Sequence, residues 1–431
     1  MKKVKVCDIV SFLIAFSMLL FAIRGKYGAI LISVLAVVLL FYRRKGVESN
    51  YISIGYAAYL ILFAVLLNTI RTLSFEYYLT IGYFVASLIC LNCSIKNYGS
   101  LWKYLQFISI LEAFGIYLQR ALPQAYYLII SIILPSNVVS SIQNRLVSGY
   151  YTGFSREVSY TMFFIVVGLG IYIFGNGSLK LKSKNERKRI GDIIAVVFLL
   201  GALFLSGKRA TLLFFILATL ATQFLRSKDR LKLLKYLLGT ICGITLLWAT
   251  SSLWLQIPAL SRIVELVRFI ETRDFIGITN GRITIYESAL KLWRNNKWIG
   301  IGWGNFKYSV FQSAWYAGFD VHNCYLQILC ETGILGAAIF YTLTIVSIIK
   351  AILAAVRFQK RDLELHNLAV LSAFIQFFFL FYCVTEPVLY EYTDYILYFI
   401  CVNISGIILK SLKRHSINNI KGDKSSEEVN G

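Results

Sequence analysis

The amino-acid sequence predicts an all-α, polytopic integral membrane protein with about twelve transmembrane helices. Of its 431 residues, 58% are hydrophobic and only 15% are charged, and the mean hydropathy is +0.66. Continuous apolar runs of about 17–25 residues recur along the chain, each long enough to cross a bilayer core of about 30 Å. A transmembrane β-barrel would instead show short segments of alternating hydrophobicity, so that class is excluded.

Window hydropathy places the spans in order, with a large outer loop between the ninth and the tenth. They fall near residues 7–23, 27–42, 51–70, 75–92, 101–118, 158–175, 191–206, 210–225, 236–254, 323–349, 367–385 and 392–409. The first run lacks a small-residue cleavage site, so we expect it to be a retained span.

Lysine and arginine gather in alternate connections, such as residues 43–45, 180–189 and 226–235. The positive-inside rule assigns this richer side to the cytoplasm. Both termini are then cytoplasmic, and residues 417–431 are expected to form a disordered tail. The net charge of +22 follows these loops, so it indicates membrane topology rather than nucleic-acid binding.

Two long segments remain on the predicted outer side, residues 119–157 and 255–322. We expect them to form the active-site face of a single transmembrane domain that comprises residues 1–416. Within the second, residues 261–275 carry a charged side chain at every third position, typical of an amphipathic surface helix. Residues 281–293 predict a second short helix.

Three cationic residues stand out on the outer side. Lys208 and Arg209 occupy a very short turn, where positive charge opposes the topology rule. An anion site would explain them because a guanidinium binds phosphate bidentately; the alternative is snorkelling to lipid headgroups. Arg282 opens the second short helix, whose N-terminus favours anions; the alternative there is a solvated loop arginine.

His322 is the only histidine on the predicted outer side and is the candidate general base. It lies where a loop meets a span, and its reference pKa of about 6.5 suits proton abstraction from a sugar hydroxyl. The alternative is a structural role, which is more common for a lone histidine. The next residue, Asn323, is spaced by four from Gln327 and Gln327 by four from Glu331. We expect this polar stripe to face a protein interior or a cavity.

Further polar residues on the outer side are weaker candidates. Arg156 and Glu157 are candidate substrate-binding residues, with a local ion pair between them as the alternative. Glu386, Glu391 and Asp394 lie at the start of the last span, where they either balance charge or contact sugars. The sequence contains no P-loop, no outer Asp-x-Asp and no spacing typical of a metal site, so we expect neither cofactor nor metal.

Taken in order, these pieces resemble the bacterial O-antigen polymerase and O-antigen ligase family. They are SGKRA at 206–210, Gly-Arg at 281–282, IGIGWGNF at 299–306, and HNxYLQ with ExGILG between 322 and 336. The ordered similarity covers the C-terminal half of the chain. In the N-terminal half, GFSREVS at 153–159 partly matches a run found in polymerases, which favours a polymerase over a ligase.

The resemblance implies a glycosyltransferase that faces outward from the bacterial cytoplasmic (inner) membrane. The donor would be an undecaprenyl-diphosphate-linked oligosaccharide, and neither metal nor nucleotide would be needed. By position, Arg209 and Arg282 would bind the diphosphate, and His322 would deprotonate or orient the acceptor hydroxyl. Membrane lipid, a flippase and a chain-length regulator would be further partners.

We therefore expect a polymerase of surface polysaccharide, which is O-antigen, capsule or exopolysaccharide. It would transfer a glycan to the sugar hydroxyl of another lipid-linked repeat unit. The nearest alternative is a ligase that transfers finished glycan to lipid A core. A flippase or transporter of lipid-linked oligosaccharide would use the arginines but leave His322 without a chemical task, and a membrane scaffold is the structural alternative.

Overall fold

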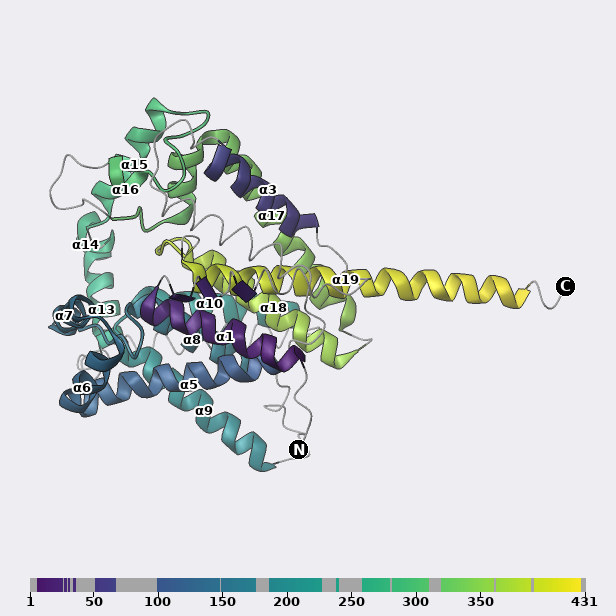
Figure 1. Cartoon of the computed structure of the whole chain (residues 1–431), viewed down its shortest axis with the longest axis horizontal. Helices are drawn as coiled ribbons and strands as arrows, with labels where there is room; N and C mark the ends of the chain where they lie inside the picture. The colour runs from purple at the N-terminus through teal and green to yellow at the C-terminus, as the bar shows by residue number, and fades with distance from the viewer. Residues whose placement is uncertain are drawn as a thin grey trace.

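The computed structural model describes most of the chain, in segments. They are residues 6–25, 27–28, 30–31, 34–35, 51–66, 99–147, 149–175, 186–226, 238–239, 258–279, 281–309, 319–359, 362–388 and 391–427. Within these segments the secondary structure is helical, with no β-strand (Figure 1). The predicted all-α class is confirmed.

Nine of the twelve predicted spans coincide with helices. They are α1 (Val6–Arg24), α3 (Tyr51–Leu60) with the π-helical η1 (Ile61–Leu66), α5 (Gly99–Ala121), α8 (Val158–Gly170) with η3 (Ile171–Gly175), α9 (Glu186–Leu205), α10 (Arg209–Arg226), α17 (Cys324–Phe358), α18 (Leu363–Tyr382) and α19 (Tyr392–Glu427). The predicted spans 27–42, 75–92 and 236–254 lie wholly or mostly outside the described residues.

Five of the described helices are long and apolar enough to cross a membrane. They are Val158–Gly175, Arg209–Arg226, Cys324–Phe358, Leu363–Tyr382 and Thr393–Lys410. The protein is therefore a multi-pass membrane protein, and the number twelve stays a prediction.

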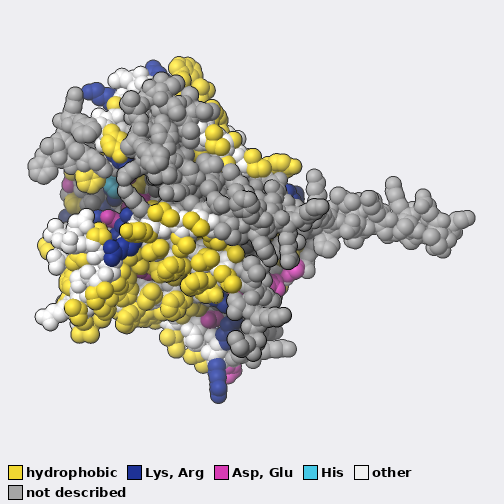
Figure 2. All heavy atoms as spheres, viewed as in Figure 1, with side chains coloured by type: hydrophobic (Ala, Val, Ile, Leu, Met, Phe, Trp, Pro, Cys, Tyr) yellow, Lys and Arg dark blue, Asp and Glu magenta, His cyan; other side chains and the backbone are white. Residues whose placement is uncertain are grey.

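The helices α8, α18 and the first part of α19 form the centre of the bundle, and α10 and α17 lie at its periphery. In the most apolar 18-residue stretch of each helix, 78%, 72% and 83% is buried for α8, α18 and α19, against 33% for each of α10 and α17. A helix that is apolar on all sides belongs in a core, and every residue of α8 except Ser159 is buried. Figure 2 shows the broad apolar surface that the bundle leaves for lipid.

The span predicted at 323–349 is correct in position but is not one continuous helix. Gly333 interrupts α17 with φ 66° and ψ −170°. There the chain packs backbone to backbone against residues 297–306, and a Cβ on Gly300 or Gly333 would overlap the opposite backbone. We call this contact between residues 297–306 and 330–335 the glycine seam. Hydropathy does not detect it, because glycine hardly interrupts an apolar run.

Four backbone hydrogen bonds of 2.8–3.3 Å close the glycine seam. The amides of Ile301 and Gly302 donate to the carbonyls of Cys330 and Glu331, and those of Ile334 and Leu335 donate to Lys297 and Trp298. The Gly-rich segment is thus fixed to α17 by its main chain.

Short helices fill the two long segments that the sequence predicts on the outer side. They are α6 (Pro123–Ile133), α7 (Ser136–Val147), α13 (Pro258–Glu271), α14 (Phe275–Thr279), α15 (Ile283–Asn295) and α16 (Phe306–Ser309). The helix expected at 281–293 is confirmed as α15. The helix expected at 261–275 corresponds to α13, which begins earlier, at Pro258, and ends at Glu271. In Figure 1 these short helices gather at one end of the bundle.

The last helix, α19, continues to Glu427 and extends away from the other helices (Figure 1). It thus enters residues 417–431, for which the disordered tail stays a prediction.

Candidate active site

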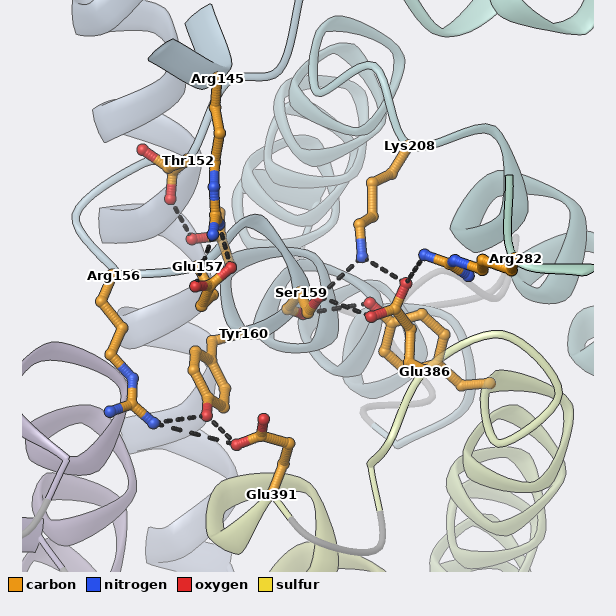
Figure 3. Close-up of polar contacts among 12 residues, drawn as sticks. Arg145, Thr152, Arg156, Glu157, Ser159, Tyr160, Lys208, Arg282, Glu386 and Glu391 are labelled. Atoms are coloured by element: carbon orange, nitrogen blue, oxygen red, sulfur yellow. Dashed lines mark hydrogen bonds and ion pairs between the residues drawn. The ribbon is translucent and has the colours of Figure 1, made fainter. Parts of the chain in front are cut away.

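The candidate site lies where the starts of α8, α10, α15 and α17 meet the connection between α18 and α19. Figure 3 shows its polar contacts. Each of these segments contributes a side chain from a helix end rather than from a helix interior. Helix N-termini carry unpaired amides and a partial positive charge, so a region where several of them converge favours anions.

The turn between α9 and α10 presents Lys208 and Arg209. Gly207 has φ +76°, and a Cβ there would overlap the carbonyl oxygen of Gly149, so only glycine fits this turn. The amide of Lys208 donates to the Ser206 hydroxyl at 3.2 Å, which fixes the start of α10. Arg209 donates to the carbonyls of residues 277 and 278 in α14 at 3.4 and 3.3 Å. The main chain at Lys208 and the guanidinium of Arg209 are therefore both held by protein groups. Arg209 lies beside α14, the helix that precedes α15.

Arg282 is the residue that precedes α15, as the sequence predicts. Its Nη1 donates to the carbonyl oxygen of Thr385 at 2.6 Å, and its Nη2 lies 3.6 Å from Oε1 of Glu386. The guanidinium thus uses both ends of its fork on the α18–α19 connection. The amide of Tyr286, one turn later in α15, donates to the carbonyl of Arg282 at 3.0 Å.

Glu386 is the carboxylate on which the site converges. Its Oε1 accepts a hydrogen bond from Lys208 Nζ at 2.7 Å, and its Oε2 accepts one from the Ser159 hydroxyl at 3.0 Å. Lys208 also donates to Ser159 at 2.6 Å, which closes a triangle of polar contacts. Burial by itself raises the pKa of Glu386, but Lys208 and Arg282 outweigh it and hold that pKa at about 2. The carboxylate is therefore ionised at any physiological pH.

His322 lies half-buried just before α17, in the left-handed region at φ 56°. Non-glycine residues rarely adopt this conformation, and at functional sites it is a recognised form of strain. Its Nδ1 is buried without a hydrogen-bond partner among the described residues. Burial and the charge of Arg282 lower the pKa of His322 from 6.5, partly opposed by Glu386 and Asp320. The imidazole is thus neutral at pH 7, as a general base must be.

The polar stripe on α17 faces the protein interior, as predicted, and its partners are now defined. Asn323 caps α17 by accepting the amide of Leu326 at 3.0 Å. Gln327 donates to Asp320 at 3.0 Å and accepts the amide of residue 321 at 3.2 Å, so it holds the residues beside His322. Glu331 accepts the amides of residues 304 and 306 at 2.8 and 3.3 Å.

Arg156 and Glu157 do not pair with each other, so the simple local ion pair is wrong. Glu157 accepts two hydrogen bonds from Arg145. Arg156 donates to the Tyr160 hydroxyl at 2.7 Å and lies 3.9 Å from Glu391, to which Tyr160 also donates (Figure 3). These pairs lie on the other side of the start of α8 from Lys208.

The structure thus brings Lys208 and Arg282 together at Glu386. His322 lies two residues before Cys324, whose thiol donates to the carbonyl of Glu386. Arg156 and Glu157 instead contact other residues, away from Glu386.

Ser159 is not a candidate site residue in the sequence, and Glu386 is expected either to balance charge or to contact sugars. In the structure Glu386 pairs with Lys208 and Arg282. Among the described residues, no group of three histidine, cysteine, aspartate or glutamate side chains could hold a metal ion. Metal independence stays a prediction.

Residues 194–341 match the Wzy_C family model, described as O-antigen ligase. No curated protein matches the chain. The matched segment contains Lys208, Arg209, Arg282 and His322, whereas Ser159 and Glu386 lie outside it. The chain carries an O-antigen ligase family domain, which confirms the family that the motifs indicate. Members of this family are glycosyltransferase-like enzymes of surface polysaccharide synthesis, and the match does not choose between polymerase and ligase.

Proposed function

We propose that this protein is a polymerase of surface polysaccharide that acts at the outer face of the bacterial cytoplasmic membrane. It would transfer a growing glycan from undecaprenyl diphosphate to a sugar hydroxyl of another lipid-linked repeat unit. The observation that supports this proposal most is the convergence of Lys208, Arg282 and His322. Lys208 and Arg282 contact the buried carboxylate of Glu386. The main-chain carbonyl of Glu386 accepts a hydrogen bond from the Cys324 thiol, two residues after His322.

The cations supply a site for the leaving group. Lys208 and Arg209 lie at the start of α10 and Arg282 at the start of α15, so side-chain charge adds to the partial charge of two helix N-termini. As the bond between sugar and phosphate breaks, negative charge grows on the diphosphate. Donors that are already in place stabilise that charge at little reorganisation cost, which lowers the barrier.

His322 supplies the base. The acceptor hydroxyl gives its proton to the neutral imidazole, and the oxygen forms the new bond to the anomeric carbon of the donor. The bond from that carbon to the phosphate oxygen breaks, and its electron pair leaves with the diphosphate. Gln327 and the cap at Asn323 position His322 for this step, because they hold the residues on both sides of it.

Purified full-length protein in detergent, given a synthetic undecaprenyl-diphosphate repeat unit alone, tests the proposal. We expect a ladder of longer glycans on a gel, and we expect His322→Ala to abolish it at an unchanged protein level. His366→Gln is the matched control, because His366 lies at the opposite end of α18 from the site and bonds the carbonyl of Ala355. A ladder that persists in His322→Ala would overturn the role of His322.

A ligase is the second candidate, favoured by the description of the matching family model. Transfer that appears only when lipid A core is added, with no ladder from the repeat unit alone, would establish it instead. If neither product forms with the correct repeat unit, the chemistry is wrong and transport of lipid-linked oligosaccharide becomes the better interpretation.

A further inference from the structure

We propose that Glu386 is an internal competitor for the diphosphate, and that it speeds release of the diphosphate product after glycan transfer. This inference rests on the proposed function, because it assigns a role within the same cation site. It concerns a residue that lies outside the matched family segment and would not itself contact the reacting carbon.

Glu386 already occupies the cations that the diphosphate needs. Its carboxylate lies 2.7 Å from Lys208 Nζ and 3.6 Å from Arg282 Nη2, and its side chain is only 8% exposed. A phosphate that binds both cations therefore has to displace this carboxylate or share its partners. Because the pKa of Glu386 is held at about 2, the competing negative charge is present throughout the working range of pH.

The main chain around Glu386 is fixed, so competition is confined to its side chain. The amide of Glu386 donates to the carbonyl of Tyr382 at 3.0 Å, and its carbonyl accepts from the Cys324 thiol at 3.1 Å. The preceding carbonyl, that of Thr385, accepts from Arg282. A carboxylate on a fixed backbone returns to the same place each time the ligand leaves, which resets the site.

The charge of the ligand rises during the reaction. A diphosphate esterified at both ends carries about two negative charges, whereas loss of the glycan frees a terminal phosphate whose second pKa is about 6. The product thus carries nearly three negative charges and binds a cation site more tightly than the donor does. Without an opposing charge, product release would limit turnover, as it does in many enzymes.

The competing explanation is that Glu386 only holds Lys208 and Arg282 in position. The two explanations predict opposite signs. Removing a support should weaken anion binding, whereas removing a competitor should strengthen it. Glu386→Gln keeps the size and one hydrogen-bond acceptor of the side chain and removes its charge, so it separates them.

Binding of inorganic pyrophosphate to the full-length protein in detergent gives the first measurement, by calorimetry. We expect Glu386→Gln to bind pyrophosphate about tenfold more tightly than wild type, because a like charge a few ångströms away has gone. Glu386→Asp, which keeps the charge, should bind like wild type. Glu391→Gln is the matched control, since Glu391 pairs with Arg156 and Tyr160, and it should leave pyrophosphate affinity unchanged.

Turnover gives the second measurement. In Glu386→Gln we expect the first round of transfer to keep its rate while steady-state turnover falls severalfold and inhibition by undecaprenyl diphosphate increases. The acid limb of the first-round rate should shift to lower pH, because Glu386 raises the pKa of His322. Equal or weaker pyrophosphate binding by Glu386→Gln would overturn the inference while leaving the proposed function intact. Pyrophosphate binding that survives Arg282→Ala would instead contradict the diphosphate site itself.

Discussion

Two carboxylates, those of Glu386 and Glu391, lie on either side of the start of α8, and their pKa values are shifted in opposite directions. Glu386 meets Ser159, and Glu391 meets Tyr160, the next residue of α8 (Figure 3). Both carboxylates belong to the α18–α19 connection and both have cationic neighbours. The pKa of Glu386 is lowered to about 2, whereas that of Glu391 is raised to about 7.

The number and distance of the cations account for the difference. Burial raises the pKa of both groups. Glu386 has Lys208 at 2.7 Å and Arg282 at 3.6 Å, which outweigh burial. Among the described residues, the cation that pairs with Glu391 is Arg156, at 3.9 Å, and Glu157 adds a like charge, so the effect of burial prevails. The excess of positive charge lies on the Lys208 side, and that side is the one suited to an anionic ligand.

The largest expected effect is the difference in activity loss between substitutions of Arg282, beside Glu386, and of Arg156, beside Glu391. Arg282→Ala should lower the rate of ladder formation by at least about a hundredfold, the usual loss for a donor that stabilises transition-state charge. Arg282→Lys should fail almost as badly, because lysine cannot contact Thr385 and an anion with a rigid fork. Arg156→Ala should cost less than about tenfold. Equal losses of activity in Arg156→Ala and Arg282→Ala, measured at matched protein levels, would contradict the proposed difference between the surroundings of Glu386 and Glu391.

The free energy of unfolding in detergent, measured between pH 2 and pH 8, should also distinguish the two carboxylates, because their contributions to stability depend on pH in opposite directions. The folded pKa of Glu386 lies below 4.5, so its stabilisation is present above pH 4.5 and is lost as the pH falls towards 2. The folded pKa of Glu391 lies above 4.5, so its contribution is present below pH 4.5 and is lost as the pH rises through 7. Each change amounts to about 3 kcal/mol.

Accordingly, Glu391→Gln should gain stability over wild type above pH 7, whereas Glu386→Gln should lose it above pH 4.5. Parallel curves for both variants would show that the two carboxylates do not differ in charge state.

The smallest expected effect concerns the two hydroxyls of α8. Ser159→Ala removes an acceptor of Lys208 and a donor to Glu386. It should lower ladder formation about fivefold, which corresponds to about 1 kcal/mol, the usual net contribution of one hydrogen bond. Tyr160→Phe should change the rate less than twofold, because its hydroxyl serves only the Arg156 and Glu391 pair. A larger effect of Tyr160→Phe than of Ser159→Ala would indicate that the site lies on the Glu391 side of α8, and would contradict the proposed site.

Much of the fold could be predicted because hydropathy reports directly on the lipid environment. The spans at 158–175, 210–225 and 367–385 match α8 with η3, α10 and α18 within a few residues, apart from the earlier start of α18 at Leu363. The break at Gly333 escaped prediction because it depends on a second segment, residues 297–306, which reaches α17 only in three dimensions.

The site could be predicted in part for a related reason. Lys208 stood out because positive charge in a short outer turn opposes the topology rule, and Arg282 because it opens a short helix whose N-terminus favours anions. Both signals are local in sequence. Glu386 gave no such signal, since it lies 178 residues from Lys208 along the chain. A carboxylate before a span fits ordinary charge balance equally well, and only the pairing distances distinguish its partners.

The glycine seam has a consequence for hydrogen exchange. The amides of Ile301, Gly302, Gly304 and Phe306 lie in a segment that is mostly irregular, yet each donates to a carbonyl or carboxylate oxygen of residues 330–331. Exchange of such amides requires their acceptors to separate, and these acceptors belong to a membrane helix. Deuterium uptake at residues 301–306 should therefore be as slow as in α17 itself, so that a loop by secondary structure behaves as core by its dynamics.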